Sequence, residues 1–179
     1  MGRLRFVVAG LAGLATVIAG AATAASFDAL LATRWQWSEG VDPITDQKVG
    51  RAVLATTIIE DIQPGVAEAR IALVCTAGKP RMLVDWSFKV AGAANLTVEY
   101  RFAGEPGRRL KARAVNRSSE EITDLGDLRR FLSDARRSDK LLLRVTSDAY
   151  GVNAATFRAA AGADIVRRFT AACPSAAPR

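Results

Sequence analysis

The chain has 179 residues, half of which are hydrophobic, so it is long enough for one domain with a sizeable core and leaves little room for two. It contains no histidine, which excludes a histidine general base. With only two cysteines, it also has too few ligands for a tetrahedral zinc site. The composition therefore favours a protein without a bound metal ion.

The formal net charge is +7, and arginine greatly outnumbers lysine. One interpretation is an anionic partner, such as nucleic acid, lipopolysaccharide or a phospholipid surface. The other is the arginine-rich composition that a GC-rich bacterial genome produces. We favour the second interpretation because the charges are spread along the sequence, and we expect no nucleic-acid partner.

The first 25 residues have the pattern of a secretory signal peptide. Arg3 and Arg5 supply the positive charge, residues 6–22 form an apolar run, and residues 22–24 (Ala-Thr-Ala) form a small-x-small cleavage pattern. An uncleaved membrane anchor is the alternative, since the run is about long enough to cross a bilayer. We expect cleavage, which leaves a periplasmic or secreted protein of a Gram-negative bacterium with no stable membrane anchor and a net charge of +5.

Alternating apolar and polar side chains predict a series of strands before position 117. They are expected at 34–37, 49–59, 71–75, 81–90, 96–102 and 109–115. The clearest alternation is in the fifth run, where Val98, Tyr100 and Phe102 predict a half-buried antiparallel strand. The third and fourth runs should form a hairpin, as should the fifth and sixth. Residues 69–104 should form the centre of a sheet.

The apolar period becomes helical near 124–136, where Asp124 or Asp127 can cap a helix, and again near 162–173. Two more strands are expected between these helices, at 140–146 and 152–158. Together the elements predict a mainly β (α+β) domain over residues 26–173: an antiparallel β-sandwich or partly open barrel of about seven or eight strands. Residues 174–179 lack periodicity and are expected to be disordered.

Cys75 and Cys173 can form one intramolecular disulfide, which exported proteins retain. It would join a central strand to the C-terminal helix. Intermolecular pairing and a redox role are the alternatives. We expect a structural disulfide.

Candidate catalytic groups are few. Asp85 stands between Val84 and Trp86, and a buried carboxylate beside an aromatic ring can act as a general acid. The alternation instead places Asp85 opposite Trp86, as a solvated or Arg-paired residue. Glu120 and Glu121 are a candidate acid pair, but they are better interpreted as lying before or at the start of a helix.

Five serines stand outside any recognised nucleophile motif: Ser26, Ser38, Ser87, Ser118 and Ser119. No phosphate-binding loop, nucleophile elbow or metal-ligand spacing occurs, so we predict no catalytic residues and no cofactor. Trp35 and Trp37 should share one side of a strand, where they either pack in the core or bind a glycan or protein. The candidate interaction surface therefore comprises Trp35, Trp37, Asp85 and Arg101.

The order of several short motifs is the most specific feature of the chain. The motifs are a strand ending in Cys75, then Val84-Asp85-Trp86, Val98 with Tyr100-Arg101, Leu141 with Arg144-Val145, Ala155 with Phe157, and a helix closing in Ala172-Cys173. In this order, and with two cysteines, the chain resembles the type VI secretion-associated VasI/TagO family over most of residues 35–173. It departs from the family pattern at Val74, at Pro174 and at Ser118-Ser119.

The resemblance implies an exported accessory protein with no known catalytic residues, associated with a type VI-like secretion apparatus. The first hypothesis is therefore a non-enzymatic binding protein of the cell envelope, which contacts an unidentified protein partner there. The alternative is a periplasmic hydrolase or enzyme inhibitor that uses surface carboxylates.

Overall fold

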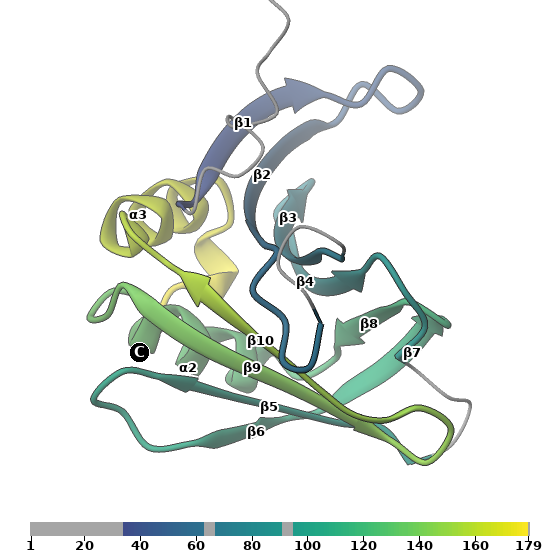
Figure 1. Ribbon diagram of the computed structural model, residues 1–179. Helices are drawn as coiled ribbons and strands as arrows, with labels where there is room; N and C mark the ends of the chain where they lie inside the picture. Colours follow the sequence, from purple (N-terminus) through teal and green to yellow (C-terminus); the bar gives the residue numbers. More distant parts are fainter. Residues whose placement is uncertain (1–33, 63–66, 91–94, 179) are drawn as a thin grey trace, which may run out of the picture.

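The computed structural model describes residues 34–62, 67–90 and 95–178 (Figure 1). The expected signal peptide, residues 1–25, and the start of the expected domain at Ser26 lie outside these residues. Within the described residues the chain forms ten β-strands, two α-helices and one 3-10 helix.

The strands form two antiparallel sheets (Figure 1). The larger sheet runs in the order β1 (Gln36–Val41), β2 (Lys48–Thr56), β3 (Ala69–Thr76), β4 (Lys79–Trp86), β8 (Ser119–Ile122) and β7 (Ala112–Asn116). The smaller sheet runs in the order β10 (Gly151–Arg158), β9 (Lys140–Ser147), β5 (Thr97–Phe102) and β6 (Arg108–Leu110). The expected fold class is confirmed: a mainly β protein whose sheets form a partly open sandwich.

The two expected hairpins are both present, β3 with β4 and β5 with β6. They belong to different sheets, however. Residues 69–104 were expected to form the centre of one sheet, and they instead supply β3 and β4 to the larger sheet and β5 to the smaller one.

The chain crosses from one sheet to the other at Lys111. The expected single strand 109–115 is divided there into β6, which pairs with β5, and β7, which pairs with β8. Lys111 belongs to neither ladder, and both of its backbone groups find other partners. Its N–H donates to the Asp127 carboxylate at 2.8 Å, and its carbonyl oxygen accepts from the Thr123 N–H at 2.9 Å. The crossing therefore leaves no backbone group of Lys111 unpaired.

Strand β8 was not predicted, and it contains Glu120 and Glu121. These two residues do lie before a helix, which begins at Leu125, but they are not at its start: both are strand residues paired with β4 and β7. All of β8 from Glu120 to Ile122 is buried. A strand that is buried on both faces shows no alternation of polarity, and glutamate is depleted in strands, so neither sequence signal was present.

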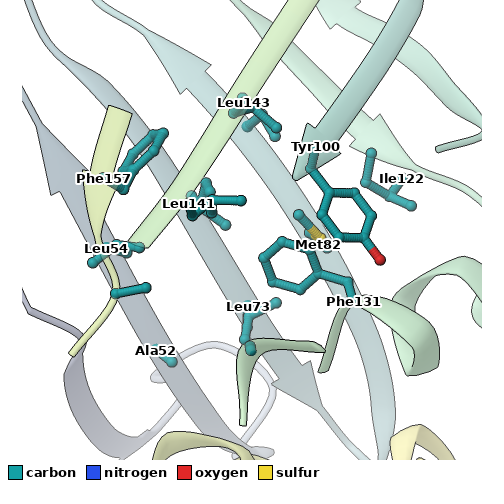
Figure 2. Close-up of a cluster of buried hydrophobic side chains, with 14 of the residues drawn as sticks. Ala52, Leu54, Leu73, Met82, Tyr100, Ile122, Phe131, Leu141, Leu143 and Phe157 are labelled. Atoms are coloured by element: carbon teal, nitrogen blue, oxygen red, sulfur yellow. The ribbon is translucent and has the colours of Figure 1, made fainter. Parts of the chain in front are cut away.

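The core fills the space between the sheets (Figure 2). Leu54, Leu73 and Met82 come from the larger sheet, and they face Leu141 and Phe157 of the smaller sheet, all fully buried. A second group is aromatic: the ring of Phe131, on a helix, lies 5.1 Å from that of Tyr100 and 5.3 Å from that of Phe102. This contact packs the helix against the smaller sheet.

Two helices close the sandwich. The expected helices at 124–136 and 162–173 are confirmed as α2 (Leu125–Ala135) and α3 (Gly162–Ala172). Asp124 caps α2 by accepting from the Asp127 N–H at 3.0 Å. Gly162 allows α3 to begin against the end of α2, because a Cβ there would lie 2.0 Å from the Ala135 carbonyl oxygen. Within the described residues, no helix has the length and hydropathy needed to cross a membrane.

Helix α2 is also held by a buried carboxylate. The side chain of Asp134 is 1% exposed and accepts from the Tyr100 hydroxyl at 2.9 Å and from Arg108 Nε at 2.8 Å. Its second oxygen accepts from Arg137 Nη2 at 2.6 Å. Three donors thus compensate the cost of burying this charge.

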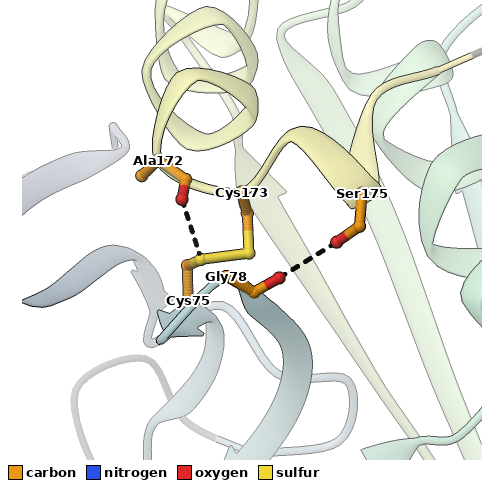
Figure 3. The surroundings of a disulfide bond; sticks show 5 residues. All are labelled: Cys75, Gly78, Ala172, Cys173 and Ser175. Carbon is orange, nitrogen blue, oxygen red and sulfur yellow. Dashed lines mark hydrogen bonds between the residues drawn. A yellow bond between two sulfur atoms is a disulfide. The ribbon is translucent and has the colours of Figure 1, made fainter. Parts of the chain in front are cut away.

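The predicted disulfide between Cys75 and Cys173 is confirmed, with the two Cα atoms 5.8 Å apart (Figure 3). It joins β3 to the end of α3. The segment after it differs from the expected disorder, because residues 174–176 form a 3-10 helix and Ala176 is fully buried. Ser175 donates to the Gly78 carbonyl oxygen at 3.1 Å, and its own carbonyl accepts from Arg129. Such long-range contacts leave no periodic signal in the sequence.

We predict that reduction of the disulfide lowers the melting temperature by several degrees. The bridge closes a loop across 98 positions, for which chain entropy gives an upper estimate of about 4 to 5 kcal/mol. Thermal unfolding followed by circular dichroism, with and without a strong reductant, measures the effect. The double variant Cys75→Ser/Cys173→Ser is the control and should be insensitive to reductant. An unchanged transition of the reduced wild-type protein would contradict the prediction.

Candidate functional site

The outer surface of the smaller sheet is strongly basic. Its four strands contain one acidic residue, Glu99, and six cationic ones. Five of these cations are exposed and project from the outer side of the sheet, and together they define what we call the basic face: Arg101, Arg109, Lys140, Arg144 and Arg158.

The alternation of the strands produces this arrangement. On either side of Arg101 in β5, Tyr100 and Phe102 are buried in the core, and Lys140 and Arg144 of β9 likewise alternate with buried leucines. The sixth cation, Arg108, has the same parity as the core residues and turns inward to Asp134. Side chains of one strand are thus divided between the core and the basic face.

Glu99 neutralises part of the basic face. It lies opposite Arg144 on one side and opposite Arg109 on the other. Arg144 Nε donates to Glu99 Oε2 at 3.0 Å, and Arg109 lies 3.5 Å from Oε1. The hydrogen bond from Arg144 is the main cause that lowers the pKa of Glu99, so this carboxylate is ionised at neutral pH.

The other three cations of the basic face have no carboxylate partner among the described residues. They are Arg101, Lys140 and Arg158. The register places Lys140 directly opposite Arg158, and it places Arg101 opposite Leu142 in the next row. Like charges on adjacent strands destabilise a sheet slightly, so nothing in the fold itself accounts for these three cations.

Two hollows lie on the basic face. One has a volume of about 520 Å³ and is lined by Arg101, Arg109, Leu142 and Arg144 among others. The second has a volume of about 790 Å³ and is lined by Arg34, Ile58, Asp139, Lys140, Thr156, Arg158 and Ala160. Leu142 of the first hollow and Thr156 of the second are register partners, so the two hollows are neighbours on one surface.

A larger hollow, of about 1020 Å³, lies beside the disulfide between β1, β2 and α3. Its two arginines, Arg167 and Arg168, are both bound to Asp164. Because both arginines are already paired and Lys48 is the one other cation of its lining, this hollow offers fewer free cations than the basic face does.

The structure corrects part of the predicted interaction surface. Trp35 is 5% exposed and belongs to the core, so the alternative of core packing holds for this residue. Trp37 is half-buried: its ring covers Gly50, and its Nε1 donates to Glu39 at 2.8 Å. Neither tryptophan lies on the basic face.

Asp85 and Arg101 are also not brought together. Asp85 is half-buried on the outer side of the larger sheet, opposite Arg70 in β3, whereas Arg101 lies on the outer side of the smaller sheet. The expectation that Asp85 lies on the side opposite Trp86 is met, since Trp86 is buried in the core. Of the four predicted interaction residues, Arg101 alone lies on the basic face.

Glu120 and Glu121 do not form an acid pair, because successive strand residues face opposite sides. Glu121 is outside the core and accepts from Arg81 at 2.6 Å and from Arg113, and these bonds, Arg81 first, lower its pKa. Glu120 is 0% exposed. Its Oε2 accepts from Trp86 Nε1 at 3.3 Å, and its Oε1 has no partner among the described residues.

Burial is the main cause that raises the pKa of Glu120 to about 8, with a smaller contribution from the charge of Asp85. Glu120 is therefore mostly protonated at neutral pH. No described hollow includes it, so a substrate has no route to this carboxyl group.

Comparison with known proteins adds no relative: no family model, curated protein or solved structure matches the chain.

Among the described residues, no group of three or more cysteine, aspartate or glutamate side chains is placed to hold a metal ion. The basic face was missed in the sequence because its cations come from four strands and look scattered along the chain.

We predict that the stability of the wild-type protein falls as pH rises from about 4.5 to about 8. Glu120 binds its proton more tightly in the folded state, so its contribution is complete below the unfolded pKa and is lost as pH approaches the folded pKa. In Glu120→Gln, which mimics the neutral acid, melting temperatures measured across this range should decline less.

The matched control is Glu121→Gln, which should act in the opposite direction. The pKa of Glu121 is lowered, so this variant should lose stability at neutral pH and little at low pH. Parallel pH profiles of melting temperature for the wild type and Glu120→Gln would contradict the assignment of Glu120.

Proposed function

We propose that this protein is an exported, non-enzymatic binding protein of the bacterial cell envelope, and that its basic face is the binding surface. The observation that carries the proposal is a group of three cations without a carboxylate partner among the described residues, Arg101, Lys140 and Arg158, on an exposed sheet whose strands include a single carboxylate. A surface that concentrates one sign of charge attracts partners of the opposite charge.

The arrangement of the carboxylates supports a non-enzymatic role. A hydrolase would need a carboxyl group that contacts its substrate. Glu120 is enclosed in the core, and Glu121 is held by two arginines. Asp85 lies opposite Arg70 of β3 and Ser119 of β8, and the acid nearest to it on β8, Glu120, faces the core instead. The alternative of a periplasmic hydrolase or inhibitor therefore gains no support from these groups.

Two further features support export to the envelope. The Cys75–Cys173 disulfide suits an oxidising compartment, and residues 1–25 have the pattern of a signal peptide. The resemblance to the VasI/TagO family leads us to propose, in addition, an association with a type VI-like secretion apparatus and a protein partner there. Both of these remain predictions from the sequence.

The test is fractionation of bacteria that express the full chain. We predict that the protein reaches the periplasm and sediments with the envelope in a salt-sensitive manner. The variant Arg101→Glu/Lys140→Glu/Arg158→Glu should move to the soluble periplasmic fraction. These three side chains are exposed and unpaired within the described residues, so the variant should fold, and its disulfide content and melting temperature verify this.

A matched control has the same charge change on other surfaces. Arg51, Lys79 and Arg117 are also exposed and without a carboxylate partner among the described residues, and they belong to the larger sheet and its turns. The variant Arg51→Glu/Lys79→Glu/Arg117→Glu should stay with the envelope. A wild-type protein that remains in the cytoplasm, or two variants that distribute alike, would contradict the proposal.

A further inference from the structure

Carboxylates that each bind two arginines compensate much of the positive charge of the molecule, and the basic face keeps three cations beyond this compensation. Elsewhere, one carboxylate commonly binds two arginines: Asp134 binds Arg108 and Arg137, Glu121 binds Arg81 and Arg113, and Asp164 binds Arg167 and Arg168. On the basic face, Glu99 likewise binds Arg109 and Arg144, whereas Arg101, Lys140 and Arg158 have no carboxylate partner among the described residues. These three cations leave an excess of positive charge on this sheet.

We infer that the basic face docks on the surface of an anionic phospholipid bilayer, with headgroup phosphates received in its two hollows. This inference rests on the proposal that the basic face is the binding surface, and it names the partner of that surface. The chemistry fits, since a guanidinium group binds phosphate oxygens in a bidentate manner and lysine binds them as a point charge.

The shape of the surface favours a bilayer. Four adjacent strands span about 14 Å from the first to the last, so the cations are spread over a broad sheet rather than gathered in a deep cleft. The hollows of about 520 and 790 Å³ are neighbours on that sheet. A surface of this kind contacts several phosphates at once, which a membrane of anionic lipids presents in a plane.

Apolar side chains at the margins of the basic face point to the same partner. Val152, which has the outward parity of Thr156 and Arg158 in β10, is 62% exposed. Ile58, which lines the second hollow, is 47% exposed. Membrane-surface binding combines cations at the phosphates with apolar side chains at the acyl boundary.

A nucleic acid fits this surface less well. Single strands are held by aromatic side chains on which bases stack, and the outward positions of the four strands hold none. An acidic protein remains the competing partner, and the experiment separates it from the bilayer.

The experiment is co-sedimentation of the purified mature protein, with its disulfide intact, with vesicles. One set contains equimolar phosphatidylglycerol and phosphatidylcholine, and the other contains phosphatidylcholine alone. We expect the wild type to sediment with the anionic vesicles at low salt, to be released at high salt, and not to sediment with phosphatidylcholine. Neutralising one cation, as in Arg101→Gln, should weaken binding by about fivefold.

Two charge-reversed variants distinguish an effect of the basic face from an effect of the net charge alone. Arg101→Glu/Lys140→Glu/Arg158→Glu should abolish sedimentation, and Arg51→Glu/Lys79→Glu/Arg117→Glu, with the same net charge, should retain it. The neutral triple variant Arg101→Gln/Lys140→Gln/Arg158→Gln serves if the charge-reversed protein fails to fold, and it should also lose binding.

Failure of the wild type to sediment with anionic vesicles would overturn the inference, as would equal losses in the face variant and its control. If envelope association in bacteria still depended on the basic face in that case, the partner would be an acidic protein. The proposed function would then stand, and the lipid inference alone would fall.

Discussion

The two sheets depend on one short segment of chain, which leaves the smaller sheet and enters the larger one at Lys111. Such a crossing interrupts both ladders, so its backbone groups need partners outside the sheets. Asp127, in the first turn of α2, accepts from the Lys111 N–H, and the Thr123 N–H donates to the Lys111 carbonyl oxygen. At the other end of α2, Asp134 accepts from the side chains of Tyr100 and Arg108, which lie on the strands before the crossing. Buried carboxylates thus hold the sandwich together where strand pairing stops.

The alternation of side chains along the strands also divides the positive charge between the core and the outer surface. Arg108 and Arg109 are neighbours in β6, and because strand residues alternate, Arg108 binds the buried Asp134 while Arg109 joins the basic face. Three carboxylates form ion pairs with nearby arginines: Asp134 next to the crossing, Glu121 on β8 and Asp164 on α3. On β5, β9 and β10, three cations remain exposed without a carboxylate partner in the part of the chain that the structure describes. The cations of the basic face, which look dispersed in the sequence, therefore lie together on one surface of the fold.

Sequence patterns predicted the strands that face solvent on one side, both helices and the disulfide, because each of these leaves a local or chemical signal. The crossing at Lys111 left none, since apolar residues alternate without a break through Leu110, Ala112 and Ala114 while the pairing partner changes. Strand β8 is buried on both faces and contains glutamates, so it showed neither period nor propensity. The basic face depends on register between strands distant in sequence, which only the folded chain reveals.

We conclude that α2 forms one cooperative unit with β5 and β6, the strands that lead to the crossing, through Asp134. Hydrogen–deuterium exchange of Asp134→Asn against the wild type tests it most directly. Loss of the ion pairs should lower the free energy of unfolding by about 3 kcal/mol and should increase amide exchange in β5 and β6 together with α2, while β2 and β3 stay protected. Faster exchange confined to α2 would contradict the account.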